Sequence, residues 1–316
     1  MGSTTSYASA VAAVKAMESS LLSYSDMEQL ISAATDTEFN AIISARRGSD
    51  ASAGSELADA WEIVHGYAPD CRELEMLLYK YDFHNLKAAL KAMIADCEPE
   101  PYYIRPTNLD LGELSPILKA KDYDLLPVYL RETAEKAYQL LTDTLDGQLA
   151  DSFIDTATLT VLQDSAEKSE NDFLKNYARV TAVCADIKTA YRCARMKKPR
   201  SFLEIAIAGS ADLDKEALIR AALTGTDGLF TFLDTTIYGE KARLLESSTA
   251  AFEKWCDDEV MEIARSARLQ AFGFEPLAAY YIAARAEQKN LRIIRVCKEC
   301  GADRETITER LRLLYV

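Results

Sequence analysis

The segment YDFHNLKAALKAMI (Tyr81–Ile94) indicates most directly which fold class this chain adopts. Its apolar residues recur at intervals of mostly three and four positions: Phe83, Leu86, Leu90, Met93 and Ile94. Lys87 and Lys91 fall on the other side of the same helix. An apolar stripe with this spacing is typical of an amphipathic α-helix that packs one face against a core.

Comparable periodicity extends over three later segments, Leu125–Leu145, Ala178–Met196 and Ala278–Cys300. Gly301 follows the last segment and predicts its end, because glycine readily adopts the left-handed conformation that closes a helix. Asp303 then predicts the N-cap of a final short helix. We therefore expect helices almost to the end of the chain.

Composition also predicts an all-α fold. The 316 residues include only 12 glycines and 8 prolines, few for a β-rich chain with many tight turns. Ala, Leu, Glu, Lys and Arg are abundant instead, and these residues lose little conformational freedom in a helix. Interruptions are expected where small, polar or proline residues gather: Arg46–Glu56, Asp96–Pro116, Met196–Arg200 and Gly209–Asp214.

An internal repeat runs through the chain. Three segments share an acidic residue with a polar residue three positions later and basic residues nearby: Asp82/Asn85, Asp186/Thr189 and Glu287/Asn290. The acidic residues lie about 100 positions apart, and the middle copy is degenerate. Positions three apart share a helix face, so each pair should point the same way within its unit and hydrogen-bond to a neighbouring helix.

A second set of helix-like segments alternates with the first and centres on three apolar residues: Leu30, Ile117 and Leu218. Together the two sets predict three related helical units, 1–105, 106–210 and 211–316. Three units of this size suit closure around a pseudo-threefold axis better than an open solenoid, whose repeats are usually much shorter. Closure would leave a central hollow, which is a binding surface and not a catalytic cleft.

Charge and cysteine content exclude several classes of partner. With 36 basic and 50 acidic residues the net charge is −14, which disfavours nucleic acid and anionic lipid as direct partners. The seven cysteines show no repeated spacing and predict free thiols in a reducing cytosol. Without a signal peptide or a run of about 18 apolar residues, we expect a soluble cytoplasmic protein that reaches a membrane only through another protein.

No pattern predicts a catalytic, cofactor-binding or metal site. His65 and His84 lie in different segments and lack partners at metal-ligand spacing. We interpret His84 as a packed or solvated helix residue, and His65 as a helix-end residue. Cys297 and Cys300 form a lone C-x-x-C without the second pair of a zinc ribbon, so we interpret them as thiols one helical turn apart.

Nucleotide binding and acid–base chemistry have equally little support. Gly225–Gly228 lacks the lysine and spacing of a phosphate-binding loop, so we expect that the chain does not bind ATP. Asp257, Asp258 and Glu259 are interpreted as solvated carboxylates on a helix face. A basic cluster is interpreted as a solvated loop, with contact to an acidic partner surface as the alternative: Arg195, Lys197, Lys198 and Arg200.

Several segments resemble the C subunit of the V/A-type ATP synthases, the counterpart of the d subunit in eukaryotic vacuolar ATPases. Tyr81–Lys87 is similar to the YDxxNLK segment of that family. Pro276–Arg295 resembles its C-terminal segment, in which a proline opens a helix carrying an acidic-x-x-Asn-Leu-Arg-Ile-Ile run, here Glu287–Ile294. Arg310–Val316 resembles the R-x-x-L-x-Y-V ending, and Tyr7–Leu22 is also similar. The resemblance covers nearly the whole chain and is weakest in the middle third.

The resemblance implies an all-α funnel of three similar helical domains that sits on the membrane rotor ring and receives the foot of the central stalk. It implies a non-catalytic subunit without cofactors that couples the head of a rotary ATPase to its ion-translocating ring. The partners would be central-stalk rotor subunits and the ring, and membrane contact would run through the ring alone. The residues distinguish neither proton from sodium transport nor ATP synthesis from hydrolysis. A stand-alone helical adaptor or binding scaffold is the alternative interpretation.

Overall fold

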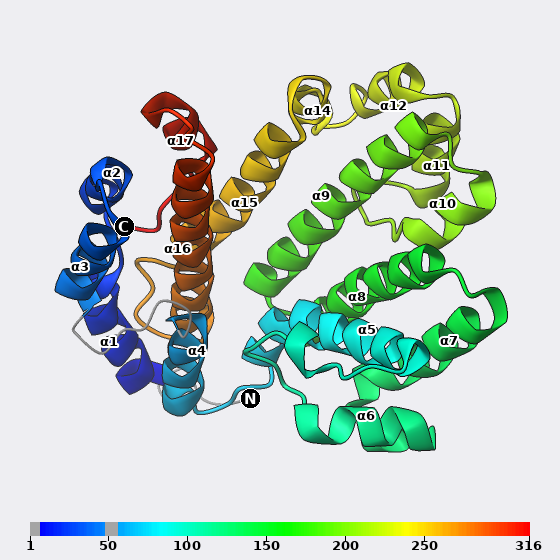
Figure 1. Cartoon of the computed structure of the whole chain (residues 1–316), viewed down its shortest axis with the longest axis horizontal. Helices are drawn as coiled ribbons and strands as arrows, with labels where there is room; N and C mark the ends of the chain where they lie inside the picture. Colours follow the sequence, from blue (N-terminus) through cyan, green and yellow to red (C-terminus); the bar gives the residue numbers. More distant parts are fainter. Residues whose placement is uncertain (1–6, 48–55) are drawn as a thin grey trace. The chain divides into compact units, whose positions relative to one another are not determined.

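A computed structural model describes residues 7–47 and 56–316, and all regular secondary structure in these ranges is helical (Figure 1). The all-α prediction is therefore confirmed for the described residues. Contacts within the chain divide it into two compact units. Unit 1 combines the residues up to Leu74 with Ser248–Val316, and unit 2 is the continuous segment Glu75–Ser247.

Unit 1 contains helices from both ends of the chain. They are α1 (Ala8–Met17), η2 (Glu18–Ser20), α2 (Tyr24–Ser32), α3 (Asp36–Arg47), α4 (Glu56–Tyr67), α15 (Thr249–Ser266), α16 (Glu275–Glu299) and α17 (Arg304–Arg310). The central helix is α16, which contacts α1, α4, α15 and α17. Its residues 276–284 are all buried, so this part of α16 is enclosed on every side.

The core of unit 1 joins α2 and α3 to the C-terminal half of α16. Its buried residues are Leu22, Met27, Leu30, Ile31, Ala33, Phe39, Ile43, Leu291, Ile294, Cys297, Ile307 and Leu314. At its edge, the Lys298 ammonium donates to the Leu30 carbonyl at 2.9 Å, although these residues lie 268 positions apart. The two ends of the chain therefore fold as one unit.

Unit 2 is a continuous run of helices. They are η3 (Leu74–Leu78, at the unit boundary), α5 (Tyr79–Ala95), η4 (Glu100–Tyr102), α6 (Leu111–Ala120), η5 (Tyr123–Leu125), α7 (Val128–Thr144), α8 (Gly147–Ser169), α9 (Asp172–Met196), α10 (Arg200–Ala206), α11 (Lys215–Leu223), α12 (Thr226–Leu233), α13 (Gly239–Ala242) and α14 (Leu244–Ser247). The long helices α8 and α9 contact each other; α8 also contacts α5, α7 and α10, and α9 also contacts α10, α11 and α12.

Most of the helix ends that were predicted from capping residues and glycine agree with the structure. Helix α9 ends at Met196, and Lys197 follows with a left-handed φ of 51°. Helix α16 ends just before Gly301, whose φ is 69°. The Asp303 side chain accepts a hydrogen bond from the Thr306 N–H at 2.8 Å and caps α17. These three predictions are confirmed because each depends on residues adjacent in sequence.

The expected break over Asp96–Pro116 is wrong at its C-terminal end. Helix α6 begins at Leu111 and contains Pro116. Proline removes one main-chain hydrogen bond inside a helix. The Asp110 cap, whose side chain accepts from the Gly112 N–H, and the buried side chains of Leu111, Leu114 and Leu118 compensate for that loss.

The second repeated set corresponds to three short helices, α2, α6 and α11. Each has a side-chain N-cap: Ser23, Asp110 and Asp214. Leu30 and Leu218 are fully buried, whereas Ile117 is half-buried and Leu118 is the buried residue next to it. The three-unit division at 1–105, 106–210 and 211–316 differs from the division by contacts, and it stays a prediction.

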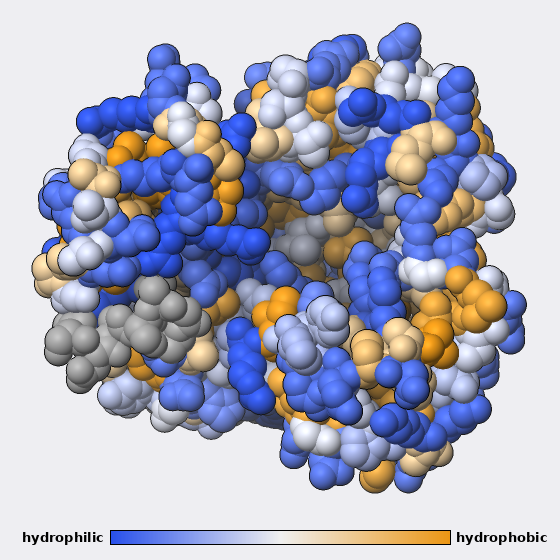
Figure 2. All heavy atoms as spheres, in the orientation of Figure 1, coloured by the Kyte–Doolittle hydropathy of each residue, from blue (hydrophilic) through white to orange (hydrophobic). Residues whose placement is uncertain are grey.

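Hydrophilic atoms cover much of the face drawn in Figure 2, and apolar atoms appear there in separate patches. Exposed large apolar side chains belong to several elements, among them Leu125, Val128, Leu145, Ile237 and Leu269. Among the described residues, no helix combines the length and the apolar character needed to cross a membrane.

Candidate functional site

The repeated acid–polar pairs lie on three long helices: Asp82 is in the first turn of α5, whereas Asp186 and Glu287 are near the middle of α9 and α16. Asp82, Asn85, Asp186, Glu287 and Asn290 are at most 2% exposed, and they account for five of the seven buried polar or charged residues described. Buried polar groups must be paired within the protein, because an unpaired one costs about 1–3 kcal/mol. Their partners therefore reveal what these positions do.

In α5, the pair holds the extended chain that follows η4. The Asn85 amide donates to the Ile104 carbonyl at 2.9 Å and accepts from the Ile104 N–H at 2.8 Å. One Asp82 oxygen accepts from the Asn108 N–H at 2.8 Å, and the other accepts from the Asn108 amide and the Tyr129 hydroxyl, each at 2.8 Å. Both carboxylate oxygens are thus occupied by partners within unit 2.

In α9, Asp186 makes an equivalent connection with its two oxygens. It accepts from the Ala208 N–H at 2.9 Å and from the Gly209 N–H at 2.7 Å. Gly209 has a φ of 80°, and a Cβ there would lie 2.9 Å from the Lys215 Cβ, so this position requires glycine. Thr189 has a hydroxyl instead of an amide and cannot form the paired bonds that Asn85 makes with one peptide unit.

Burial raises the pKa of Asp186 to about 6 from 3.8, although the Ala208 and Gly209 N–H groups partly oppose this shift. Because the pKa of Asp186 is higher in the folded chain than in the unfolded chain, protonation of Asp186 favours the folded state. The contribution of Asp186 to the stability of the fold is therefore present at low pH and is lost as pH rises through about 6. We expect the stability of the native chain, relative to Asp186→Asn, to fall by about 2 kcal/mol from about pH 4.5 to about pH 7. Urea unfolding of both proteins at each pH measures this difference, and a pH-independent difference would contradict the assignment.

In α16, the two members of the pair bind different segments. The Asn290 amide donates to the Arg312 carbonyl at 3.0 Å and accepts from the Arg312 N–H at 2.8 Å, repeating the geometry of Asn85 with Ile104. Glu287 accepts from the Leu22 N–H at 3.3 Å and forms a buried ion pair with the Arg47 guanidinium. Glu287 therefore connects α16 to the segment before α2 and to the end of α3.

These contacts correct one expectation about the repeat. The pairs were expected to bind neighbouring helices, and Asp82 and Glu287 do so through Tyr129 on α7 and Arg47 on α3. Asn85, Asp186 and Asn290 instead bind main-chain groups of extended segments 19 to 23 residues further along the chain. The physical reason is that a helix interior already pairs its N–H and C=O groups, whereas an extended segment does not. Each of the three long helices thus fixes the path of the chain that returns along it.

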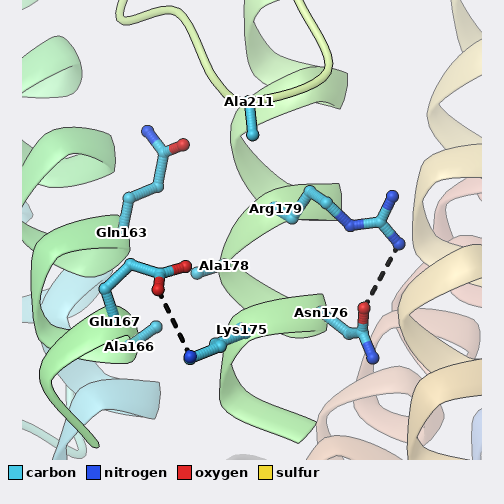
Figure 3. A pocket seen from close by; sticks show the side chains of 8 residues that line it. All are labelled: Gln163, Ala166, Glu167, Lys175, Asn176, Ala178, Arg179 and Ala211. Atoms are coloured by element: carbon cyan, nitrogen blue, oxygen red, sulfur yellow. Dashed lines mark hydrogen bonds and ion pairs between the residues drawn. The ribbon is translucent and has the colours of Figure 1, made fainter. Parts of the chain in front are cut away.

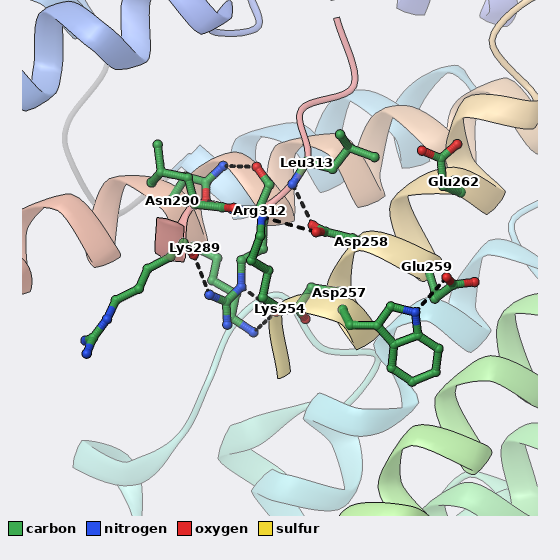
Figure 4. Close-up of polar contacts among 12 residues, drawn as sticks. Lys254, Asp257, Asp258, Glu259, Glu262, Lys289, Asn290, Arg312 and Leu313 are labelled. Carbon is green, nitrogen blue, oxygen red and sulfur yellow. Dashed lines mark hydrogen bonds and ion pairs between the residues drawn. The ribbon is translucent and has the colours of Figure 1, made fainter. Parts of the chain in front are cut away.

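The acidic residues of α15 hold the C-terminal segment (Figure 4). Asp257 accepts from the Arg312 guanidinium at 2.7 Å and from the Lys289 ammonium at 2.5 Å, and Asp258 accepts from the Leu313 N–H at 2.6 Å. Burial opposes ionisation of Asp257, but the two cations outweigh it and lower its pKa. The interpretation of these carboxylates as solvated was wrong, because their partners lie far away in sequence.

Glu259 also has a partner within the chain. It accepts a hydrogen bond from the Trp255 indole at 2.8 Å, one turn earlier on the same helix (Figure 4). The acidic run of α15 therefore makes its contacts within unit 1.

A pocket of about 360 Å³ lies in unit 2 between α8, α9 and the loop before α11 (Figure 3). Its lining is Gln163, Ala166, Glu167, Lys175, Asn176, Ala178, Arg179 and Ala211. Lys175 pairs with Glu167 at 3.3 Å and Arg179 pairs with Asp212 at 2.7 Å. Because both cations are already neutralised, the pocket offers a phosphate group little electrostatic attraction.

The two histidines and the two cysteines of the C-x-x-C lie in different parts of the structure and do not form a common site. His84 lies 3.2 Å from the Tyr102 carbonyl, and His65 lies in the last turn of α4, as expected. Cys297 is buried, Cys300 is exposed, and both are free thiols. The described residues include no group of three His, Cys, Asp or Glu side chains arranged to hold a metal ion.

The basic cluster is in part the solvated loop that was expected, because Lys197 and Lys198 lie between α9 and α10 and Arg195, Lys197 and Arg200 are exposed. Arg195 lies in the last turn of α9 over the Tyr191 ring, and Arg200 begins α10. Lys198 donates to the Gln148 side chain at 2.6 Å. Arg200 pairs with Glu204 at 2.7 Å and with Glu216 at 2.5 Å. These basic residues are close in sequence, but Arg195, Lys198 and Arg200 each make a separate contact.

The described residues form a helical protein in which buried polar and charged side chains hydrogen-bond to extended segments of its main chain. A family model described as ATP synthase (C/AC39) subunit matches residues 10–310. The chain therefore belongs to this family of rotary ATPase subunits, as the resemblance of its motifs predicted.

A characterised relative is similar over most of both chains. The C subunit of the V-type sodium ATPase of Enterococcus hirae is 25% identical over 271 residues, which cover 84% of this chain and 82% of that protein. The matched region contains most of both units, so the likeness concerns the whole fold and not a single motif.

Proposed function

We propose that this chain is a non-catalytic coupling subunit of a V/A-type rotary ATPase, which joins the central rotor shaft to the ion-translocating ring in the membrane. Family membership over residues 10–310 is the observation that carries the proposal. The buried network supports it, because a part that transmits torque needs segments that are held firmly. Asp82, Asp186 and Asn290 each hold a returning segment at buried hydrogen bonds of 2.7 to 3.0 Å.

The proposal includes a socket built from three similar helical parts, 1–105, 106–210 and 211–316, around a pseudo-threefold axis. The recurrence of one device in α5, α9 and α16 supports it, since each long helix pins an extended segment through buried side chains. Closure would suit a coupling part, because a ring of packed interfaces resists shear better than units joined only by linkers. A map of the assembled complex would test the axis directly.

Co-purification tests the proposed partners. When the ATPase is isolated through a tag on its membrane ring, we expect this chain to be present together with the central-stalk subunits. When the ring is removed, we expect the chain to remain bound to the stalk subunits and to no membrane component. The isolated chain should not bind anionic lipid vesicles, because its net charge is −14. A chain that never appears with ring or stalk would instead fit the stand-alone adaptor. Its proposed location is the cytoplasmic side of the membrane, held there through the complex.

We also expect that the purified chain neither binds nor hydrolyses ATP. The segment Gly225–Gly228 lacks a phosphate-loop lysine, and the cations of the α8–α9 pocket are paired with acidic residues. Isothermal titration calorimetry with Mg-ATP at millimolar concentration checks this expectation. Saturable heat would contradict it.

A further inference from the structure

An extended segment, residues 311–316, follows α17 and binds both α15 and α16; we name it the strap (Figure 4). Arg312, Leu314 and Tyr315 in it are at most 7% exposed. Successive side chains of an extended chain point to opposite sides, so burial of both Leu314 and Tyr315 means that the strap is covered on two sides. Leu314 packs in the core with α2, α3 and α16, and the Tyr315 hydroxyl donates to Glu18 at 3.2 Å. The strap therefore fills a groove within unit 1.

Side chains of α15 and α16 bind the main chain of the strap. Four consecutive residues take part: the Leu311 carbonyl accepts from Lys254, both main-chain groups of Arg312 pair with Asn290, the Leu313 N–H donates to Asp258, and the Leu314 carbonyl accepts from Arg265. Lys254, Asp258 and Arg265 are separated by four and seven positions and so share one face of α15. Main-chain hydrogen bonds of this kind supply affinity for an extended peptide.

Side chains of the strap add selectivity. The Arg312 guanidinium donates to Asp257 at 2.7 Å, and a charge-assisted bond of this kind favours a basic residue at that position. Leu314 and Tyr315 supply two buried apolar anchors. The groove thus combines main-chain bonds with one acidic contact and two apolar contacts, which together select arginine followed two and three positions later by leucine and tyrosine.

Helix α15 buries little apolar surface of its own. Of its 18 residues, only Phe252, Met261 and Ala264 are buried. Helix α17, which leads to the strap, has one buried residue, Ile307. A segment with few buried apolar contacts opens at a lower free energy than the core around it. Polar bonds to the strap must therefore supply part of the stability with which α15 is held.

We propose that the groove between α15 and α16 is a peptide-binding site for an extended Arg-x-Leu-Tyr segment, and that its occupant is residues 311–316 of the same chain. Helix α17 ends at Arg310, directly before the strap, so the chain itself delivers this ligand to the groove. Binding of the strap holds α15 against α16. The site lies within unit 1 and does not depend on the proposed coupling role.

Cleavage of the folded chain tests this site. A protease recognition sequence is inserted between Arg310 and Leu311, the protein is purified uncut, and cleavage then frees residues 311–316 as a peptide. An excess of fluorescent peptide of the same sequence should bind to the cut chain and not to the uncut chain, because the strap occupies the groove until it is cut. Arg312→Ala and Tyr315→Ala peptides should each compete at least about tenfold less well than the native peptide. A Val316→Ala peptide, altered at a half-buried position, is the control and should compete within about twofold of the native peptide.

Hydrogen exchange in the uncut chain without an insertion gives an independent measurement. The variant Arg312→Ala/Tyr315→Ala should speed amide exchange in α15 at least about tenfold, and exchange in α9 of unit 2 should stay at the native rate. The inference is overturned if the fluorescent peptide does not bind to the cut chain, binds equally to the uncut chain, or shows no preference for Arg312 and Tyr315. Equal acceleration of exchange in α15 and α9 would also overturn it, because the strap would then support the whole chain and not one helix.

Discussion

Replacing Asn290 with leucine is expected to lower the free energy of unfolding by about 2–6 kcal/mol. The substitution removes both hydrogen bonds to the Arg312 peptide, at 3.0 and 2.8 Å, and leaves a buried N–H and a buried carbonyl unpaired. Each such group costs about 1–3 kcal/mol, and leucine has the same number and branching of side-chain heavy atoms as asparagine, so the loss does not come from a cavity. The measurement is urea unfolding followed by circular dichroism.

Two companion variants make this result specific. Gln288→Leu changes a half-buried amide two positions away on the same helix and should alter the free energy of unfolding by less than about 0.5 kcal/mol. Asn85→Leu removes the same pair of bonds, here to Ile104, in unit 2 and should cost about as much as Asn290→Leu. If Asn290→Leu were as mild as Gln288→Leu, the paired amide bonds would not be a principal support of the fold.

Replacing Glu287 with leucine is expected to reduce ion transport per ATP hydrolysed severalfold in the assembled complex. The carboxylate is 2% exposed and joins α16 to Arg47 at the end of α3 and to the Leu22 N–H. Disruption of a buried ion pair typically costs about 3–5 kcal/mol, because the remaining charge stays in a poorly solvated place. Looser packing of unit 1 would allow the proposed coupling subunit to deform when torque is applied, so that less rotation would reach the ring.

The measurement compares ATP-driven ion uptake by membrane vesicles with ATP hydrolysis by the detached head. Hydrolysis by the head should be unchanged, because this chain is proposed to have no catalytic role. Glu299→Leu, which removes an exposed carboxylate from the same helix, serves as the control and should leave uptake at the native level. Full uptake with Glu287→Leu, together with unchanged stability, would contradict both the structural role of this ion pair and its link to coupling.

Much of the candidate network was visible in the sequence as residue types, but not as contacts. The spacing of Asp82/Asn85 and Glu287/Asn290 correctly indicated polar residues with a shared structural role. Their partners were not predictable, because a side chain on a helix does not reveal which distant segment returns to it. Asp257 illustrates the limit: in an acidic chain it resembles many solvated carboxylates, yet it binds Arg312, 55 residues later.

The division of the chain into two units could not be predicted from neighbouring residues either. Proline and glycine mark where helices stop, and they predicted breaks near residue 99 and residue 209. Whether the helices on either side then pack together depends on complementary apolar surfaces. Leu30 packs in the same core as Ile294, and no feature of either segment alone indicates the other.

The sequence by itself determined the all-α class, the position of most helix ends and the family. These properties depend on apolar periodicity, on caps such as Asp303 and on left-handed positions such as Gly301, all of which act within a few residues. Only the tertiary structure decided that both chain ends form unit 1 and that Asn85 and Asn290 bind extended backbone. The physical reason is that hydrogen bonds and ion pairs between distant segments depend on how surfaces pack in three dimensions, and packing selects among many pairings that the local pattern allows equally.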